Sequence, residues 1–206
     1  MLYISQPTEF GTVYTLEELE ALSAPCPNHN IPLYIDGARM GYALAAEGNN
    51  PTLKDIARLA DVFYIGGTKL GTLFGEALVV TNRKLLKNLF PLVKQHGALL
   101  AKGRLLGLQF EAMFTDGLYY EIGRHAVTQA LRIREAFRAA GCEVVIESPT
   151  NQQFFRLPNA TIDRLRNEAS FDYWGARGET SSIVRLVTSW STTTADVDRL
   201  IELINM

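Results

Sequence analysis

Cysteine and histidine are scarce in this chain, which has two cysteines and three histidines among 206 residues. Cys26 and Cys142 match neither a metal-binding nor a redox spacing, and we interpret both as small buried apolar residues of a reducing compartment. No group of His, Asp or Glu has metal-ligand spacing, and no serine lies in a nucleophile elbow. The sequence therefore argues against a metal site, a thiol redox centre and a serine hydrolase.

The chain also lacks an excess of one charge and any long apolar run. Its net charge of −2 gives no electrostatic basis for binding nucleic acid or an anionic membrane. No apolar stretch is long enough to span a bilayer, and Leu2-Tyr3-Ile4 follows the first residue without the basic segment of a signal peptide. With 47% hydrophobic and 20% charged residues, we expect a globular cytoplasmic protein.

Strand-like and helix-like segments alternate through the first half. Thr15 and Thr52 each begin a predicted helix as a hydroxyl cap, and Pro25 is expected near the end of the first. The alternation predicts a mostly parallel sheet covered on both faces. A strand beginning at Leu2 would be an unprotected sheet edge, so something is expected to cover it or to be missing. The predicted strands are 2–4, 33–35, 62–65 and 77–80.

The second half has a different pattern. Residues 119–140 predict a long helix that ends at Gly141, followed by strands with intervening helices over 144–187 and a last helix over 195–204. We expect a large domain over residues 1–116 and a small α+β domain over 117–206.

Asp36 and Lys69 each follow a predicted strand, after Leu33 to Ile35 and after Val62 to Ile65. Open α/β sheets bind ligands at the carboxyl ends of their strands. Lysine amines form imines with carbonyl cofactors, and pyridoxal phosphate sites add an acidic partner for the ring nitrogen. The pair therefore suggests a pyridoxal phosphate site. A turn aspartate and a solvated surface lysine are the alternatives.

Three more residues next to this pair are candidates for the same cofactor site. Ala38 is small enough to lie against a ring whose edge Arg39 reaches, and Thr68 offers a hydroxyl beside Lys69. Arg39 could instead pair with a carboxylate elsewhere.

Arg185 shares a strand face with Ile183 and Val187, so it is costly to bury without a partner. A substrate carboxylate held in a bidentate clamp or an internal salt bridge would each satisfy it.

Together these residues resemble the threonine aldolase and β-eliminating lyase group of fold-type I pyridoxal phosphate enzymes. The resemblance runs through essentially the whole chain and implies that fold, with a partial large domain and a small α+β carboxy-terminal domain. The segments that carry it are Ile4 to Tyr14, Tyr34-Ile35-Asp36-Gly37-Ala38-Arg39, Tyr64-Ile65-Gly66-Gly67-Thr68-Lys69 and Val184-Arg185-Leu186-Val187.

The resemblance also implies roles for single residues. Lys69 would be the imine-forming lysine, Asp36 the partner of the pyridine nitrogen, and Arg39 a contact of the ring hydroxyl. Arg185 would bind the substrate α-carboxylate. Lys94 and Lys102 lie where the family places basic residues near the cofactor phosphate across a subunit interface. The implied reaction cleaves threonine, allo-threonine or related β-hydroxy amino acids to glycine and an aldehyde, in a homodimer or homotetramer.

One departure from the family is large. Family members carry, before the segment matching Leu2, a stretch with a Gly-rich phosphate loop and a ring that stacks on the cofactor. The given sequence contains neither of these features. Each charged hydrogen bond to a phosphate is worth about 1.5–3 kcal/mol. We therefore expect a carboxy-terminal portion of an aldolase-like protein with weak cofactor binding by itself. β-Elimination, transamination and a non-catalytic paralogue remain alternatives.

Overall fold

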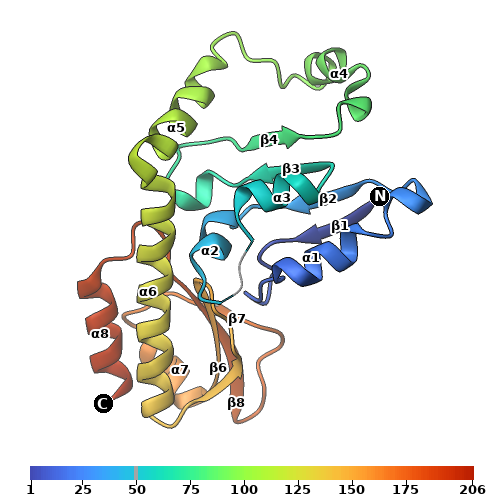
Figure 1. Cartoon of the computed structure of the whole chain (residues 1–206). Coiled ribbons are helices and arrows are strands. Elements are labelled where there is room, and N and C mark those ends of the chain that lie inside the picture. The colour runs from blue at the N-terminus through green and yellow to red at the C-terminus, as the bar shows by residue number, and fades with distance from the viewer. Residues whose placement is uncertain (49–50) are drawn as a thin grey trace.

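The computed structural model describes residues 1–48 and 51–206 and shows two four-stranded sheets joined by a long helix (Figure 1). The first sheet has the order β1-β2-β3-β4. Its strands are β1 (Leu2–Ser5), β2 (Leu33–Asp36), β3 (Val62–Ile65) and β4 (Ala77–Val80). β1, β2 and β3 are parallel, whereas β4 pairs antiparallel with β3. The prediction of a mostly parallel sheet is confirmed, and β1 lies at its edge.

The helices that cover this sheet begin where the sequence predicts. Thr15 caps α1 (Leu16–Ser23) and Thr52 caps α3 (Leu53–Leu59), each in a complete capping box. Leu19 and Ile56 from these helices pack with Ile35 of β2 in one buried core. This core covers one face of the first sheet.

The other face of the first sheet is not covered by a helix in the described part of the chain. Tyr3, Tyr34 and Tyr64 project from this face, and Tyr3 is 52% exposed. The rings of Tyr3 and Tyr34 are stacked with centroids 5.3 Å apart. The expectation of a sheet covered on both faces is wrong for these residues, because their strands alternate buried apolar side chains with tyrosines rather than being apolar throughout.

The second sheet is antiparallel, with the order β5-β6-β8-β7. It consists of β5 (Glu143–Ile146), β6 (Gln152–Pro158), β7 (Asp172–Tyr173) and β8 (Ser181–Val187). The helices α7 (Asn159–Leu165) and α8 (Thr194–Ile204) complete this part. Strands and helices together make it an α+β unit, as predicted.

The long helix α6 (Leu118–Ala139) contributes to both cores. Its Ala126 and Val127 pack in the core of the first sheet, and its Ile133 and Phe137 pack in the core of the second. Gly141, at φ +79°, follows its end, as predicted. The short η4 (Thr115–Gly117) precedes α6. The proposed domain boundary at residues 116–117 stays a prediction.

Some elements have no clear signal in the sequence. Three helices were not predicted: α2 (Met40–Ala45), α4 (Leu89–Gln95) and α5 (Arg104–Phe114). Short 3-10 turns are η1 (Pro27–His29), η2 (Thr68–Leu70) and η3 (Arg83–Leu86). None of the three helices has a side-chain cap, and α2 is short, so the signals that identify α1 and α3 are missing. Cys26 is buried as expected, whereas Cys142 is only half-buried.

In the described residues, no helix is both long enough and apolar enough to cross a membrane.

Replacing Phe137 with alanine tests the second core. Its buried ring lies 4.5 Å, centroid to centroid, from that of Phe155. Phe137→Ala is expected to lower the free energy of unfolding by about 3–5 kcal/mol, because it leaves a cavity. Leu73→Ala, at a residue 85% exposed in the loop before β4, is the control and should change it by less than about 0.5 kcal/mol. Urea unfolding followed by circular dichroism measures both, and equal effects would contradict this description of the core.

Candidate active site

The carboxyl ends of β2 and β3 lie side by side because the two strands are parallel neighbours. The loops that follow are in close contact, with the Gly66 amide donating to the Gly37 carbonyl at 2.8 Å. A Cβ on Gly37 would lie 2.0 Å from the Tyr64 carbonyl oxygen, and one on Gly66 would lie 2.2 Å from that of Ala38. Glycine at both positions therefore allows the two loops to pack and brings Asp36 and Lys69 to one edge of the sheet.

Asp36, the last residue of β2, accepts hydrogen bonds on both carboxylate oxygens. The Tyr3 hydroxyl donates to Oδ2, the Tyr64 hydroxyl donates to Oδ1, and the Ala38 amide donates to Oδ1 at 3.0 Å. Partial burial alone would raise the pKa of Asp36, but these hydrogen bonds and the charge of Lys69 outweigh it and lower the pKa. Asp36 is therefore an ionised carboxylate at neutral pH.

Lys69 lies in η2, directly after the glycine loop. Its side chain reaches solvent, yet partial desolvation and the positive charge of Arg39 lower the pKa of its amine, against the opposing charges of Glu9, Asp36 and Glu76. The buried Tyr42 of α2 donates a hydrogen bond to the Lys69 carbonyl oxygen. The unpredicted helix α2 therefore holds the backbone that carries the lysine.

A cavity of about 310 Å³ contains Lys69 and Arg39 in its wall. Asn151 and Trp190 also line it, so both parts of the chain contribute. The Asn151 side chain is buried, and its Oδ1 has no hydrogen-bond partner among the described residues. Small-molecule pockets typically measure about 300–1,000 Å³ and contain a few convergent polar groups. The cavity thus has the size and polarity of a small ligand site.

Arg39 and Arg185 meet at one carboxylate. Arg39 is only 13% exposed and donates from Nη1 to Glu9 Oε1 at 2.9 Å. Arg185 of β8, 17% exposed, approaches Glu9 Oε2 at 3.5 Å. The structure therefore brings four of the predicted residues, Asp36, Arg39, Lys69 and Arg185, into one charged region.

Arg185 has internal partners, which was one of the two alternatives for it. Its Nη2 donates to Asp172 at 2.7 Å, its Nη1 donates to Gln152 at 3.1 Å, and its guanidinium carbon lies 5.0 Å from the centre of the Trp174 ring. The predicted alternation of β8 is confirmed, since Val184 and Leu186 are buried on its opposite face.

Ala38 and Thr68 lie in the two loops next to the charged residues. Ala38 is half-buried, and its amide bonds Asp36. The Thr68 hydroxyl donates to Glu76 at 3.1 Å, and the same carboxylate accepts from the Gly67 amide at 2.6 Å. Glu76 therefore orders the loop before Lys69.

Lys94 and Lys102 lie apart from this region. Lys94 is at the end of α4 and Lys102 is in the segment before α5, and both residues are exposed. Figure 1 shows α4 far from the long helix α6. Neither makes an ion pair within residues 1–48 and 51–206. Their expected role is to lie near the cofactor phosphate across a subunit interface, and this role stays a prediction.

Sequence reasoning missed Glu9, Tyr3, Tyr64 and Asn151. Tyr3 and Tyr64 could have been found, because the period-two alternation of the parallel strands places them on the same face as Asp36. Glu9 and Asn151 lie in loops, and no local pattern indicates where their side chains point.

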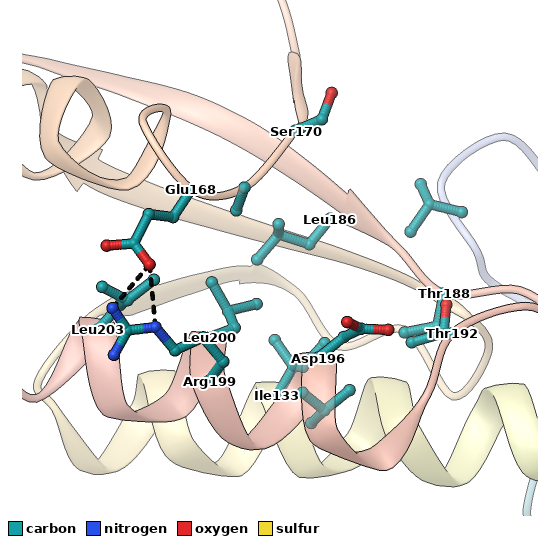
Figure 2. A pocket seen from close by; sticks show the side chains of 13 residues that line it. Ile133, Glu168, Ser170, Leu186, Thr188, Thr192, Asp196, Arg199, Leu200 and Leu203 are labelled. Atoms are coloured by element: carbon teal, nitrogen blue, oxygen red, sulfur yellow. Dashed lines mark hydrogen bonds and ion pairs between the residues drawn. The ribbon is translucent and has the colours of Figure 1, made fainter.

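A second cavity, of about 290 Å³, lies between α8, β8 and the segment after α7 (Figure 2). Its lining is mostly apolar, and its charged groups have partners: Glu168 bonds Arg199 at 2.7 Å, and Asp196 is in the α8 capping box. We therefore place the candidate chemistry at Lys69 instead. Among the described residues, no group of three His, Cys, Asp or Glu side chains could hold a metal ion.

Comparison with solved structures shows a closely similar fold. The chain superposes on the threonine aldolase of Leishmania major with a TM-score of 0.95 and 44% identity, covering 98% of this chain and 59% of that one. An aspartate aminotransferase of Thermus thermophilus matches with a TM-score of 0.69 at 17% identity, which shows the fold alone. These matches confirm the predicted fold-type I architecture.

Sequence comparison gives the family. A low specificity L-threonine aldolase of a Pseudomonas species is 32% identical over 201 residues, covering 96% of this chain and 56% of the relative. The enzyme of the same name from Pseudomonas aeruginosa is also 32% identical, with 97% and 56% covered. This chain thus spans a little more than half the length of these relatives. The family model for beta-eliminating lyase matches residues 1–159, and the chain belongs to this family.

Proposed function

We propose that the chain carries part of the active site of a pyridoxal phosphate-dependent lyase of the L-threonine aldolase type. Its reaction would cleave threonine, allo-threonine or a related β-hydroxy amino acid to glycine and an aldehyde. The observation that carries the proposal is the meeting of Lys69, with its lowered pKa, Asp36 and Arg39 at two adjacent strand ends. The names of the relatives support the same reaction class.

The residues present fit this cofactor. Asp36 is ionised and uses three acceptor positions of a carboxylate that has about four, so it can still pair with a pyridine nitrogen. The depressed pKa of Lys69 leaves more of its amine neutral, which imine formation requires. The cavity beside it has space for a small ligand, and the Oδ1 of Asn151, which has no hydrogen-bond partner in the described part of the chain, offers an acceptor.

When bound, the cofactor would supply an electron sink for the carbanion that Cα–Cβ cleavage produces. Asp36 would keep its ring nitrogen protonated, because an adjacent negative charge favours the cationic form. Arg39 would bind the ring hydroxyl, and Arg185 would hold the substrate α-carboxylate by charge-assisted hydrogen bonds. Ala38 and Thr68 would contact the cofactor from the two loops.

We also propose that the active form is a homodimer or homotetramer in the cytoplasm, with Lys94 and Lys102 near a phosphate bound by another copy. Exposed apolar residues on and next to α4 and α5 support an interface there. They are Leu89, Phe90, Leu92, Leu99, Leu100, Leu105 and Leu108.

β-Elimination is the second candidate reaction, because the matching family is named for it. An assay separates the two: aldehyde release from threonine or allo-threonine, weak for the chain by itself, is expected to exceed pyruvate release from serine. Pyruvate as the main product would contradict the aldolase assignment.

The same assay tests Asp36. Asp36→Asn should lower aldehyde release by at least about tenfold, because an amide cannot hold the ring nitrogen protonated.

Covalent capture tests Lys69. The chain is incubated with millimolar pyridoxal phosphate, reduced with borohydride and digested for mass spectrometry. We expect the adduct on Lys69 and its loss in Lys69→Ala, whereas Lys54→Ala, at an exposed lysine of α3, should retain it. No adduct on Lys69 in the unaltered chain would overturn the proposed cofactor.

The pH dependence of Lys69 reactivity tests the role of Arg39. Because Arg39 helps to lower the pKa of Lys69, Arg39→Met should raise this pKa, so that acylation of Lys69 has its midpoint at a higher pH. Mass spectrometry after a brief pulse of acetic anhydride measures the labelled fraction at each pH. Arg58→Met, in an exposed ion pair with Glu20, is the control and should leave the midpoint unchanged. A midpoint that Arg39→Met does not move would contradict this coupling.

A further inference from the structure

Glu9 connects the two arginines of the candidate site. Its carboxylate accepts from Arg39 at 2.9 Å through Oε1 and lies 3.5 Å from Arg185 through Oε2. Glu9 itself is 63% exposed, whereas both arginines are largely buried. A solvent-accessible carboxylate thus lies where two buried guanidinium groups converge, which is the geometry in which arginines bind an anionic ligand.

Buried contacts determine the position of the segment that carries Glu9. The Gly11 carbonyl accepts from Ser148 Oγ and from Thr150 Oγ1, each at 3.0 Å. A Cβ on Gly11 would lie 2.2 Å from Ser148 Oγ, and its φ is +72°. The Phe10 ring packs 5.5 Å from that of Trp174. The backbone of Glu9 is therefore held against the second sheet, so its place between the arginines follows from the fold.

Glu9 makes the weakest of the polar contacts of Arg185. The distance to Glu9 is 3.5 Å, compared with 3.1 Å to Gln152 and 2.7 Å to Asp172. The Arg185 Nε is buried and has no hydrogen-bond partner within the described part of the chain. The guanidinium is thus incompletely satisfied, and an incoming carboxylate would most easily replace the contact with Glu9.

We infer that Glu9 is an internal carboxylate that occupies the place of the substrate carboxylate on Arg185 and competes with it. On binding, the amino acid takes over the Arg185 contact, while Glu9 keeps its shorter hydrogen bond to Arg39. Glu9 therefore sets the affinity of the site for amino acid carboxylates. This inference rests on the proposed function, because it takes Arg185 as the group that binds the substrate carboxylate.

Titration with glycine tests this competition. The chain, labelled with ¹⁵N-arginine and incubated with pyridoxal phosphate, is titrated while the Arg185 side-chain resonance is followed, assigned by its loss in Arg185→Lys. Glu9→Gln should lower the half-saturating glycine concentration about two- to fivefold, the range of an exposed ion pair. Glu9→Asp keeps the charge but shortens the reach to Arg185, so it should lower the concentration by a smaller factor.

Glu17→Gln is the matched control, because it removes the same charge from an exposed residue of α1. It should leave the half-saturating glycine concentration unchanged. Methylamine, which has no carboxylate, should leave the Arg185 resonance unperturbed when it replaces glycine. An unchanged or higher glycine requirement in Glu9→Gln overturns the inference, since Glu9 would then merely brace the arginines. Borohydride capture on Lys69 in the same samples separates the failures: an adduct without a Glu9 effect refutes only the competition, and no adduct refutes the proposed function.

Discussion

The parallel pairing of β2 with β3 is the constraint on which the rest of the candidate site depends. It places the carboxyl ends of both strands at one edge of the sheet, so Asp36 and the loop before Lys69 become neighbours. Gly37 and Gly66 make this possible, since a Cβ on either would collide with the backbone of the other loop or strand. Tyr42 and Tyr119, from α2 and α6, then hold the Lys69 and Gly66 carbonyls.

Charge balance is the second organising feature of this region. Arg39 lowers the pKa of Lys69, while hydrogen bonds from two tyrosines keep the pKa of Asp36 low although the carboxylate is partly buried. The two arginines share Glu9, and Arg185 has Asp172 as a further partner. Each cation therefore has an anionic neighbour, and Arg39 and Lys69 of this group line the cavity.

Sequence patterns predicted the elements whose signals are local. Thr15 and Thr52 identified two helices because capping boxes are formed within four residues, and the apolar spacing of α6 identified the longest helix. Signals that depend on distant contacts failed. The helix α2 has no side-chain cap, so nothing local marks where it begins. The open face of the first sheet is a different case, because its strands do alternate buried side chains with tyrosines.

The sequence by itself determined the family, the strand alternation that places Arg185 on the face opposite Val184 and Leu186, and the residues available for chemistry, because these depend on residue type and near neighbours. Only the tertiary structure decided which of them meet. It joined Asp36, Lys69, Arg39 and Arg185 in one region, left Lys94 and Lys102 apart, and placed Glu9 between the arginines. Such contacts join residues far apart in the chain, and strand pairing and loop packing, rather than local sequence, bring them together.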